Sequence, residues 1–231
     1  MYLLPVDLGG EDPRSLLPPA TVDAVRGLRT FIVENAKSAR RFLKAVDHSC
    51  PLQEISFHLF DEHTSEADIE PLLDLLLKGE NCGLMSEAGC PAVADPGARL
   101  VRRAHESGVR VVPLVGPSSL LLALMASGMN GQRFAFHGYL PVDRTRRAHK
   151  LKDIETRAQT ETQIFIETPY RNAALLNALL EHCRGDTLLC IAADLTLPTE
   201  SVVTRAVAQW KKKPPALDRR LVVFLLYRGN S

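Results

Sequence analysis

The chain has 231 residues, which is enough for one large or two small domains with a substantial core. Apolar residues make up 45% and charged residues 24% of it, as in soluble globular proteins, and no apolar run is long enough to span a bilayer. The formal net charge is +1 and the sequence pI is near 7.7, which gives no general attraction to nucleic acid.

The first part of the chain alternates between strands and helices. Short apolar runs predict strands, and apolar residues at i, i+3, i+4 and i+7 predict amphipathic helices. The predicted strands are 2–6, 29–33, 54–59, 82–85 and a run from residue 109, and the helices between them begin near 18 or cover 39–46, 69–77 and 100–104. Ser65 and Asp68 resemble a capping box before the third helix. Five such alternations predict a parallel sheet covered on both faces, with right-handed crossovers.

A second set of elements follows Gly116 and Pro117. Ser118 is expected to cap an apolar helix over 120–126. The later strands are predicted at 134–139, 163–167, 187–193, 201–204 and 221–227, with helices at 144–157, at 172–183 and near Trp210. We therefore predict two α/β domains, 1–114 with a largely parallel sheet and 115–231 with a mixed sheet.

The distribution of charge and the numbers and spacing of cysteines and histidines indicate which partners, metal sites and cellular compartment to expect. Residues 1–114 hold 12 basic and 17 acidic residues, whereas residues 115–231 hold 16 and 10, so the second domain suits an anionic partner. The five cysteines are an odd number without CxxC spacing, which favours reduced thiols in a cytoplasm. No HExxH motif or neighbouring cysteine ligand supports a metal site. The N-terminal stretch has no basic region or cleavage site, so no secretory signal is expected.

Three stretches are candidates for a binding site. SEAGCPAVADPG, residues 86–97, follows the predicted strand 82–85 and is rich in small residues, as are loops where a ligand approaches the backbone. GPSS, residues 116–119, offers hydroxyl and N–H groups at a helix start, and IFIETPYR, residues 164–171, ends a strand in a carboxylate, an aromatic residue and an arginine. Plain turns, an N-cap and a surface ion pair are the alternative interpretations of these features.

Other motifs are absent or ambiguous. The chain has no GxGxxG after its first strand, no Walker A lysine motif and no GxSxG, which argues against dinucleotide oxidoreductases, NTPases and the common hydrolases. The basic run from Arg144 to Lys152 is either a solvated helix face or a surface for phosphate.

Together, four motifs resemble the ribosomal RNA branch of the tetrapyrrole methylase superfamily. SEAGCPAVADPG is similar to that branch's S-D-A-G-x-P-x-x-x-D-P-G, and LVGPSSLLLALMASG to its P-G-P-S-A helix start. FAFHGYLP and IFIETPYR are similar to its F-x-F-x-G-F-L-P and F-Y-E-S-P-H-R. Three further motifs of the branch are eroded, at 6–10, 33–37 and 193–197, so the chain looks like a paralogue.

The resemblance implies two α/β domains with S-adenosylmethionine (SAM) in the cleft between them, in a cytoplasmic homodimer that transfers a methyl group to RNA, on a ribose 2′-hydroxyl. The residues expected to bind the cofactor are Ser86, Glu87, Ala88, Gly89, Val93, Ser118, Ser119, Phe165 and Glu167. Those expected to bind the acceptor are Glu34, Tyr170, Arg171, Arg146 and Arg147. Glu34, Asp95 and Glu167 are all candidates for a general base, and the sequence does not choose among them. A tetrapyrrole acceptor and a non-catalytic SAM- or RNA-binding paralogue remain alternatives.

Overall fold

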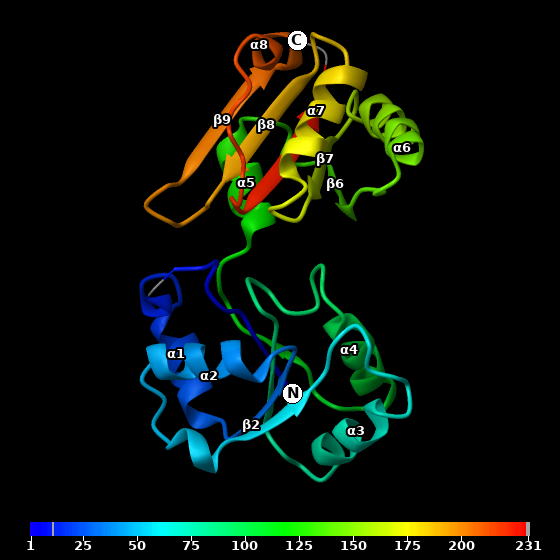
Figure 1. Ribbon diagram of the computed structural model, residues 1–231. Helices are drawn as coiled ribbons and strands as arrows, with labels where there is room; N and C mark the ends of the chain where they lie inside the picture. The colour runs from blue at the N-terminus through cyan, green and yellow to red at the C-terminus, as the bar shows by residue number, and fades with distance from the viewer. Residues whose placement is uncertain (11, 230–231) are drawn as a thin grey trace. The chain divides into compact units, whose positions relative to one another are not determined.

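The computed structural model describes residues 1–10 and 12–229, and it divides into two compact units, Met1–Ser118 and Ser119–Ser231 (Figure 1). Each unit is an α/β sandwich with a sheet of its own. The N-terminal parallel sheet and the C-terminal mixed sheet that the sequence predicts are both confirmed. Among the described residues no helix has the length and apolarity needed to cross a membrane.

The first unit is built on a five-stranded sheet with the order β3-β2-β4-β1-β5, in which every pairing is parallel. Its strands are β1 (Tyr2–Leu4), β2 (Thr30–Val33), β3 (Ser56–Leu59), β4 (Cys82–Met85) and β5 (Val112–Pro113). Its helices are α1 (Pro19–Gly27), α2 (Ala36–Ala45), α3 (Ile69–Leu77) and α4 (Gly97–Glu106), with short 3₁₀ turns at Pro13–Ser15 and Leu52–Glu54.

The helices of the first unit cover the two faces of its sheet in pairs, α1 with α2 and α3 with α4 (Figure 1). Alternate side chains of a strand point to opposite faces, so Phe31 and Val33 pack under α1 and α2 while Ile32 packs under α3 and α4. Both faces are therefore apolar, which explains the continuous hydrophobic runs of β2 and β4.

The second unit has the strand order β6-β7-β10-β8-β9. Its strands are β6 (Phe134–Tyr139), β7 (Thr162–Ile166), β8 (Leu188–Ala193), β9 (Ser201–Ala206) and β10 (Val222–Tyr227), and its helices are α5 (Ser119–Ser127), α6 (Arg144–Arg157), α7 (Asn172–His182) and α8 (Val207–Lys212). β6 and β7 are parallel, and β10 is antiparallel to both β7 and β8. Hence β6, β7 and β8 all run in one direction, and their carboxyl ends share one edge of the sheet.

Two local predictions hold only in part. Asp68 Oδ2 accepts from the Ser65 N–H at 3.3 Å, as in a capping box, but the Ser65 hydroxyl donates to the same oxygen at 2.6 Å, and α3 begins only after Asp68, at Ile69. The strand expected from residue 109 shrinks to β5, which pairs only with β1, at Val112 and Pro113. Proline lacks the N–H needed to extend such an edge pairing.

The cysteines behave as the sequence predicts, since all five are free. Cys82, Cys183 and Cys190 are buried in the cores. Burial raises the pKa of the Cys82 thiol to about 11 and that of Cys183 to about 12. Thiols of this kind are packing groups and poor nucleophiles at neutral pH.

Gly116, in the GPSS stretch, is required by close packing. A Cβ at this position would overlap the rigid ring of Pro5 and lie 3.0 Å from Leu17 Cδ2. We expect Gly116→Ala to lower the free energy of unfolding of the first unit by about 1–3 kcal/mol, the usual cost of overpacking. Gly27→Ala is the matched control, because nothing lies within 4 Å of a Cβ there and alanine favours a helix. Urea titration measures both variants, and equal stabilities would contradict this explanation.

Candidate functional site

The carboxyl edge of the first sheet contains a topological switch point between β2 and β4. These strands are neighbours, but the chain leaves β2 toward β3 on one side and leaves β4 toward β5 on the other. The loops that follow the two strands therefore diverge, which opens a crevice where α/β proteins commonly bind ligands. The loop after β4 is the SEAGCPAVADPG stretch, so the structure places it at this point.

Backbone contacts join this loop to two other stretches of the first unit. The Val6 N–H donates to the Gly89 carbonyl at 2.9 Å, and the Gly89 N–H donates to the Asp7 carbonyl at 3.3 Å. The Cys90 thiol donates to the Pro117 carbonyl at 3.4 Å. Gly89 has a φ of 71°, a left-handed conformation that glycine adopts without a steric penalty.

Asp95 shapes the second half of the loop. Its carboxylate accepts from the Ala92 N–H at 2.9 and 2.8 Å through its two oxygens, and from the Gly97 N–H at 2.6 Å. Ala92 and Ala94 are held at φ values of 66° and 62°, where a Cβ is strained. Non-glycine residues in such strained conformations persist only where the surrounding structure holds them, and they are concentrated at ligand sites.

Glu34 lies next to this loop, directly after β2. Its Oε2 accepts from the Glu87 N–H at 3.2 Å, and Glu34 and Asp95 line one small pocket together with Met85 and Pro91. Burial, and then the charge of Asp95, raise the pKa of Glu34. Burial also raises the pKa of Asp95, against the opposing effect of its hydrogen bonds. Two carboxyl groups with raised pKa values in one pocket are typical of a functional site.

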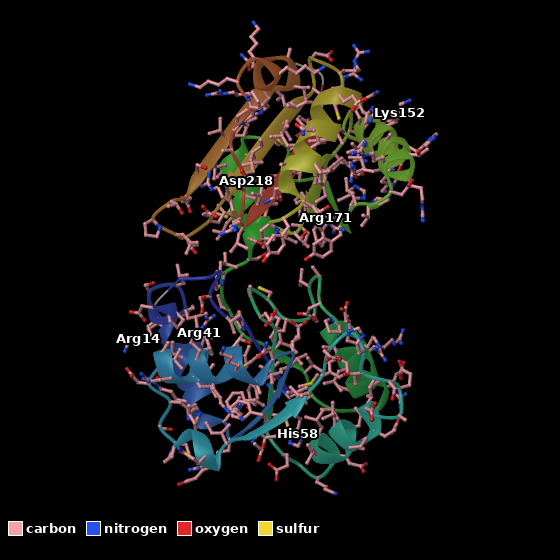
Figure 2. The ribbon with its side chains drawn as sticks, in the orientation of Figure 1. Arg14, Arg41, His58, Lys152, Arg171 and Asp218 are labelled. Carbon is pink, nitrogen blue, oxygen red and sulfur yellow. The ribbon has the colours of Figure 1, made fainter. Side chains whose placement is uncertain are left out.

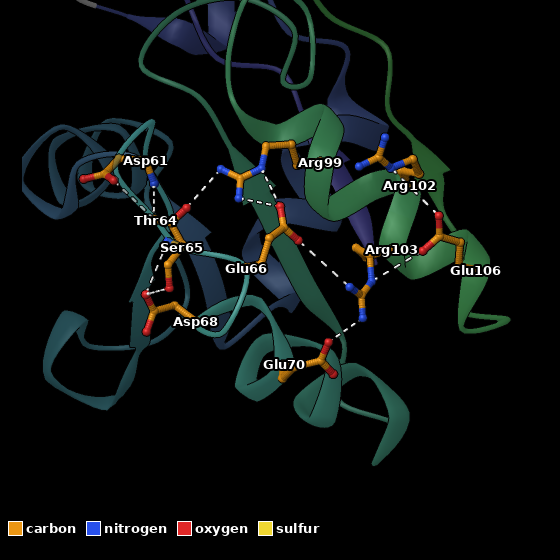
Figure 3. Close-up of polar contacts among 10 residues, drawn as sticks. All are labelled: Asp61, Thr64, Ser65, Glu66, Asp68, Glu70, Arg99, Arg102, Arg103 and Glu106. Atoms are coloured by element: carbon orange, nitrogen blue, oxygen red, sulfur yellow. Dashed lines mark hydrogen bonds and ion pairs between the residues drawn. The ribbon is translucent and has the colours of Figure 1, made fainter.

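Ion pairs support the helix that begins at the end of the loop. Arg99 of α4 donates to Glu66 Oε1, at 2.7 Å from Nη2, and to the Thr64 carbonyl at 3.0 Å (Figure 3). One turn later, Arg103 pairs with Glu70 and Glu106 (Figure 3). Each exposed pair contributes about 0–1 kcal/mol, but the network ties α4 to α3 and to the segment before it.

A second set of site residues lies at the carboxyl edge of the second sheet, directly after β7. The Glu167 side chain is fully buried, and its Oε1 accepts from the Thr168 N–H at 2.7 Å and from Arg171 at 2.9 and 2.6 Å. Glu167 Oε2 is buried and has no hydrogen-bond partner among the described residues. A buried carboxylate oxygen without a donor is costly, so this position suits a ligand that supplies one.

Two further buried polar atoms without a partner in the described part of the chain lie at the same edge, Asn172 Oδ1 and Thr196 Oγ1. Asn172 opens α7, and Thr196 lies in the turn after β8 with a φ of 71°. Asn172 Nδ2 donates to the Arg220 carbonyl at 2.8 Å, which fixes the side chain in an orientation where its Oδ1 accepts no hydrogen bond from the described residues. The edge therefore presents three buried polar atoms that fit a ligand rich in N–H and O–H groups.

The structure separates the predicted site residues into these two edges. Ser86, Glu87, Ala88, Gly89 and Val93 share one loop with Glu34 beside it. The unit boundary falls between Ser118 and Ser119, both half-buried. Glu167 and Arg171 form an ion pair, and Figure 2 labels Arg171. Tyr170, which precedes Arg171 in the chain, is exposed.

Phe165 does not offer its side chain to a ligand. The ring is fully buried in the core of the second unit, stacked on Phe224 with 5.9 Å between centroids. Only its backbone could line a cofactor site. Arg147 is also buried on α6, whereas Arg146 is exposed on the same helix.

Sequence reasoning missed the roles of Asn172 and Thr196 and took Asp95 only for a candidate base. The D-P-G sequence carried a usable signal for Asp95, since an aspartate two residues before a glycine commonly accepts from that glycine's N–H. No local signal marks Asn172 or Thr196, because their orphaned atoms result from long-range packing. In the described ranges no group of three or more His, Cys, Asp or Glu residues could hold a metal ion.

Comparison with known proteins assigns the family. The sequence model of the Tetrapyrrole (Corrin/Porphyrin) Methylases matches residues 14–210, which is most of the chain. The chain belongs to the tetrapyrrole methylase family. The resemblance noted from the four motifs is therefore confirmed, and with it the methyltransferase class.

Relatives of the chain place it within this family. It is 32% identical over 209 residues to a Vibrio cholerae protein, covering 90% of this chain and 69% of the relative. It is 29% identical to a Bacillus subtilis protein (90% and 68%) and 36% identical to one from Streptococcus pyogenes serotype M6 (85% and 64%). All three are named Ribosomal RNA small subunit methyltransferase I. The alignments thus cover about two thirds of each relative's length.

Solved structures of tetrapyrrole methylase-like proteins share the fold. A diphthine synthase superposes with a TM-score of 0.69 at 15% identity, covering 98% of this chain and 88% of its own. The methyltransferase CobJ superposes with a TM-score of 0.64 at 17% identity, covering 99% and 95%. At these identities the likeness concerns the fold alone.

Proposed function

We propose that the chain binds SAM and methylates a ribose 2′-hydroxyl of ribosomal RNA. The observation that carries this proposal is the similarity, over 85–90% of the chain, to relatives named Ribosomal RNA small subunit methyltransferase I. The homodimer and the cytoplasmic location rest on the same resemblance and stay predictions.

The residues at both sheet edges support SAM as the cofactor. SAM carries a positive sulfonium, an ammonium group, an exocyclic amine and two ribose hydroxyls, so it is rich in donors and cationic at the reacting centre. The first edge supplies carboxyl groups at Glu34, Glu87 and Asp95 and a glycine that permits close approach to the backbone. The second supplies the unpartnered Glu167 Oε2.

SAM supplies an electrophilic methyl group, and the protein must orient the acceptor and remove its proton. A ribose hydroxyl is a weak nucleophile, so it needs a base. Asp95 uses both carboxylate oxygens to hold its loop, and Glu167 is buried against Arg171. Glu34 is half-buried with its pKa raised by burial and by Asp95, which brings it closer to the value that suits a base at neutral pH. Glu34 is therefore our candidate for the base.

Transfer of a labelled methyl group tests the proposal. We expect label from SAM to enter small-subunit ribosomal RNA and to survive alkaline hydrolysis in dinucleotides, since a 2′-O-methyl group blocks cleavage at that ribose. Calorimetry should show SAM binding well below ~1 mM, which corresponds to about 4 kcal/mol. Label in a tetrapyrrole would move the acceptor to that class. SAM binding without transfer to either would favour a non-catalytic paralogue.

A further inference from the structure

A groove separates α6 and α7 on the outer face of the second unit. The two helices lie side by side (Figure 1), and side chains from both line a hollow of about 590 Å³. Alanines at 148, 174 and 178 leave the space open. The charged groups that line it are Arg144, Arg147 and Lys152 from α6 and Glu181 from α7, and Figure 2 marks Lys152 on α6.

Arg147, which lines the groove, has a donor atom without an acceptor among the residues that the structure describes. This side chain is only 8% exposed, and its Nη1 donates to the Val142 carbonyl at 3.3 Å. Its Nε is buried with no hydrogen-bond partner within residues 1–10 and 12–229. A buried guanidinium N–H without an acceptor is unfavourable, so a ligand that brings an oxygen atom into the hollow would be stabilised.

The charge of the groove selects an anion. Three cations face one carboxylate, and the Glu181 carboxylate lies 3.9 Å from His182 Nε2. Arg144 and Lys152 stand two helical turns apart, about 12 Å along α6 at 1.5 Å per residue. A row of cations of this length matches a chain of phosphates better than a single ion.

We infer that this groove binds backbone phosphates of single-stranded RNA, an inference that rests on the proposed function and names a contact surface for its acceptor. The guanidinium fork of Arg147 matches a phosphate group in a way that a lysine ammonium does not. Tyr139 ends β6 and Tyr170 lies between β7 and α7, and these two side chains are 54% and 88% exposed. Exposed aromatic rings next to a cationic groove are typical of proteins that stack unpaired bases.

Only some residues of the basic run from Arg144 to Lys152 line the groove. Arg144, Arg147 and Lys152 line the hollow, whereas Arg146 does not. Lys150 also lies outside it and pairs with Asp153 at 3.5 Å, as Arg157 does at 3.4 Å. Lys150 and Arg157 therefore provide a control pair on the same helix with the same charge.

The test compares the salt dependence of binding to a short oligouridylate by fluorescence anisotropy. The groove variant is Arg144→Gln with Lys152→Gln, and the control is Lys150→Gln with Arg157→Gln. Each phosphate contact on a single strand contributes about −0.7 to the log–log slope, so the groove variant should lose about 1.4 and the control should keep the wild-type slope. Arg147→Lys, which keeps the charge, should weaken binding several-fold at an unchanged slope.

Equal losses in the groove and control variants, or no loss in either, would overturn the inference. So would release of the RNA by inorganic phosphate beyond its release by chloride at equal ionic strength, because that result indicates a site for free phosphate. Circular dichroism confirms that each variant is folded. Methyl transfer is measured separately: a groove-dependent slope without transfer to RNA would leave the groove standing and refute the proposed function. Methyl transfer to RNA with a salt slope that the groove variant does not change would support the proposed function and refute the groove as the RNA contact.

Discussion

Replacing Asp95 with alanine is expected to weaken SAM binding by more than about 100-fold, because the loop after β4 loses the acceptor that shapes it. The carboxylate accepts from the Ala92 and Gly97 N–H groups, and hydrogen bonds to a charged group contribute about 1.5–3 kcal/mol each. Ala92 and Ala94 are held in left-handed conformations that cost about 1–2 kcal/mol per residue. Without Asp95 they should relax and carry the loop away from the switch point. Calorimetry with SAM measures the affinity.

Asp95→Asn is the matched control, since an amide oxygen still accepts and its SAM affinity should stay within about tenfold of wild type, or ~1.4 kcal/mol. Burial raises the folded-state pKa of Asp95 above 3.8, so the folded chain keeps this proton where the unfolded chain has lost it. The contribution of Asp95 to stability is thus greatest below about pH 3.8 and falls as the pH rises through the raised pKa. As the pH rises across this window, Asp95 should make the free energy of unfolding of wild type fall relative to that of Asp95→Asn, which has no carboxyl group to titrate. A folded Asp95→Ala protein that binds SAM as tightly as wild type would refute the role of the carboxylate.

Replacing Glu34 with glutamine is expected to lower kcat by about 10²–10⁴-fold while leaving SAM affinity nearly unchanged. Glutamine keeps an oxygen that can accept from the Glu87 N–H, but it cannot take a proton from the acceptor hydroxyl. Because the pKa of Glu34 is raised by burial and by Asp95, the wild-type rate should increase with pH through that pKa and then level off. The variant should lack this rise. Single-turnover transfer to RNA over a pH series measures both effects.

Asp61→Asn is a suitable control for Glu34. Asp61 follows β3 at the same edge of the sheet, and its Oδ1 accepts from the His63 N–H at 2.9 Å, which asparagine can also do. Its variant should keep the wild-type plateau rate and the rise with pH, with the rise moved slightly to lower pH because the Asp61 charge contributes to the raised pKa of Glu34. If Glu34→Gln turned over as fast as wild type, a different group would have to accept the proton.

Local sequence patterns determined most of the elements of this protein. β4, β6 and α6 begin and end at the residues that the apolar runs and helical periodicity indicate, because an apolar strand run or a capped helix is specified by its own residues. The order of the four motifs likewise identified the family. Glycine and proline positions marked the loops, since glycine permits backbone conformations closed to other residues, whereas proline fixes φ and lacks an N–H.

Tertiary structure alone decided which side chains reach a ligand. Phe165 and Glu167 are two residues apart and lie on the same face by strand alternation, yet Phe165 joins the core while Glu167, just past the end of β7, retains an unpartnered oxygen. The bridge from Val6 to Gly89 and the raised pKa of Glu34 depend on strands brought together from distant parts of the chain. Arg147 differs from Arg146 because it lies on the side of α6 that shares a hollow with α7, where its side chain is buried. Burial and hydrogen-bond satisfaction are properties of packed neighbours, so a residue's own sequence context does not contain them.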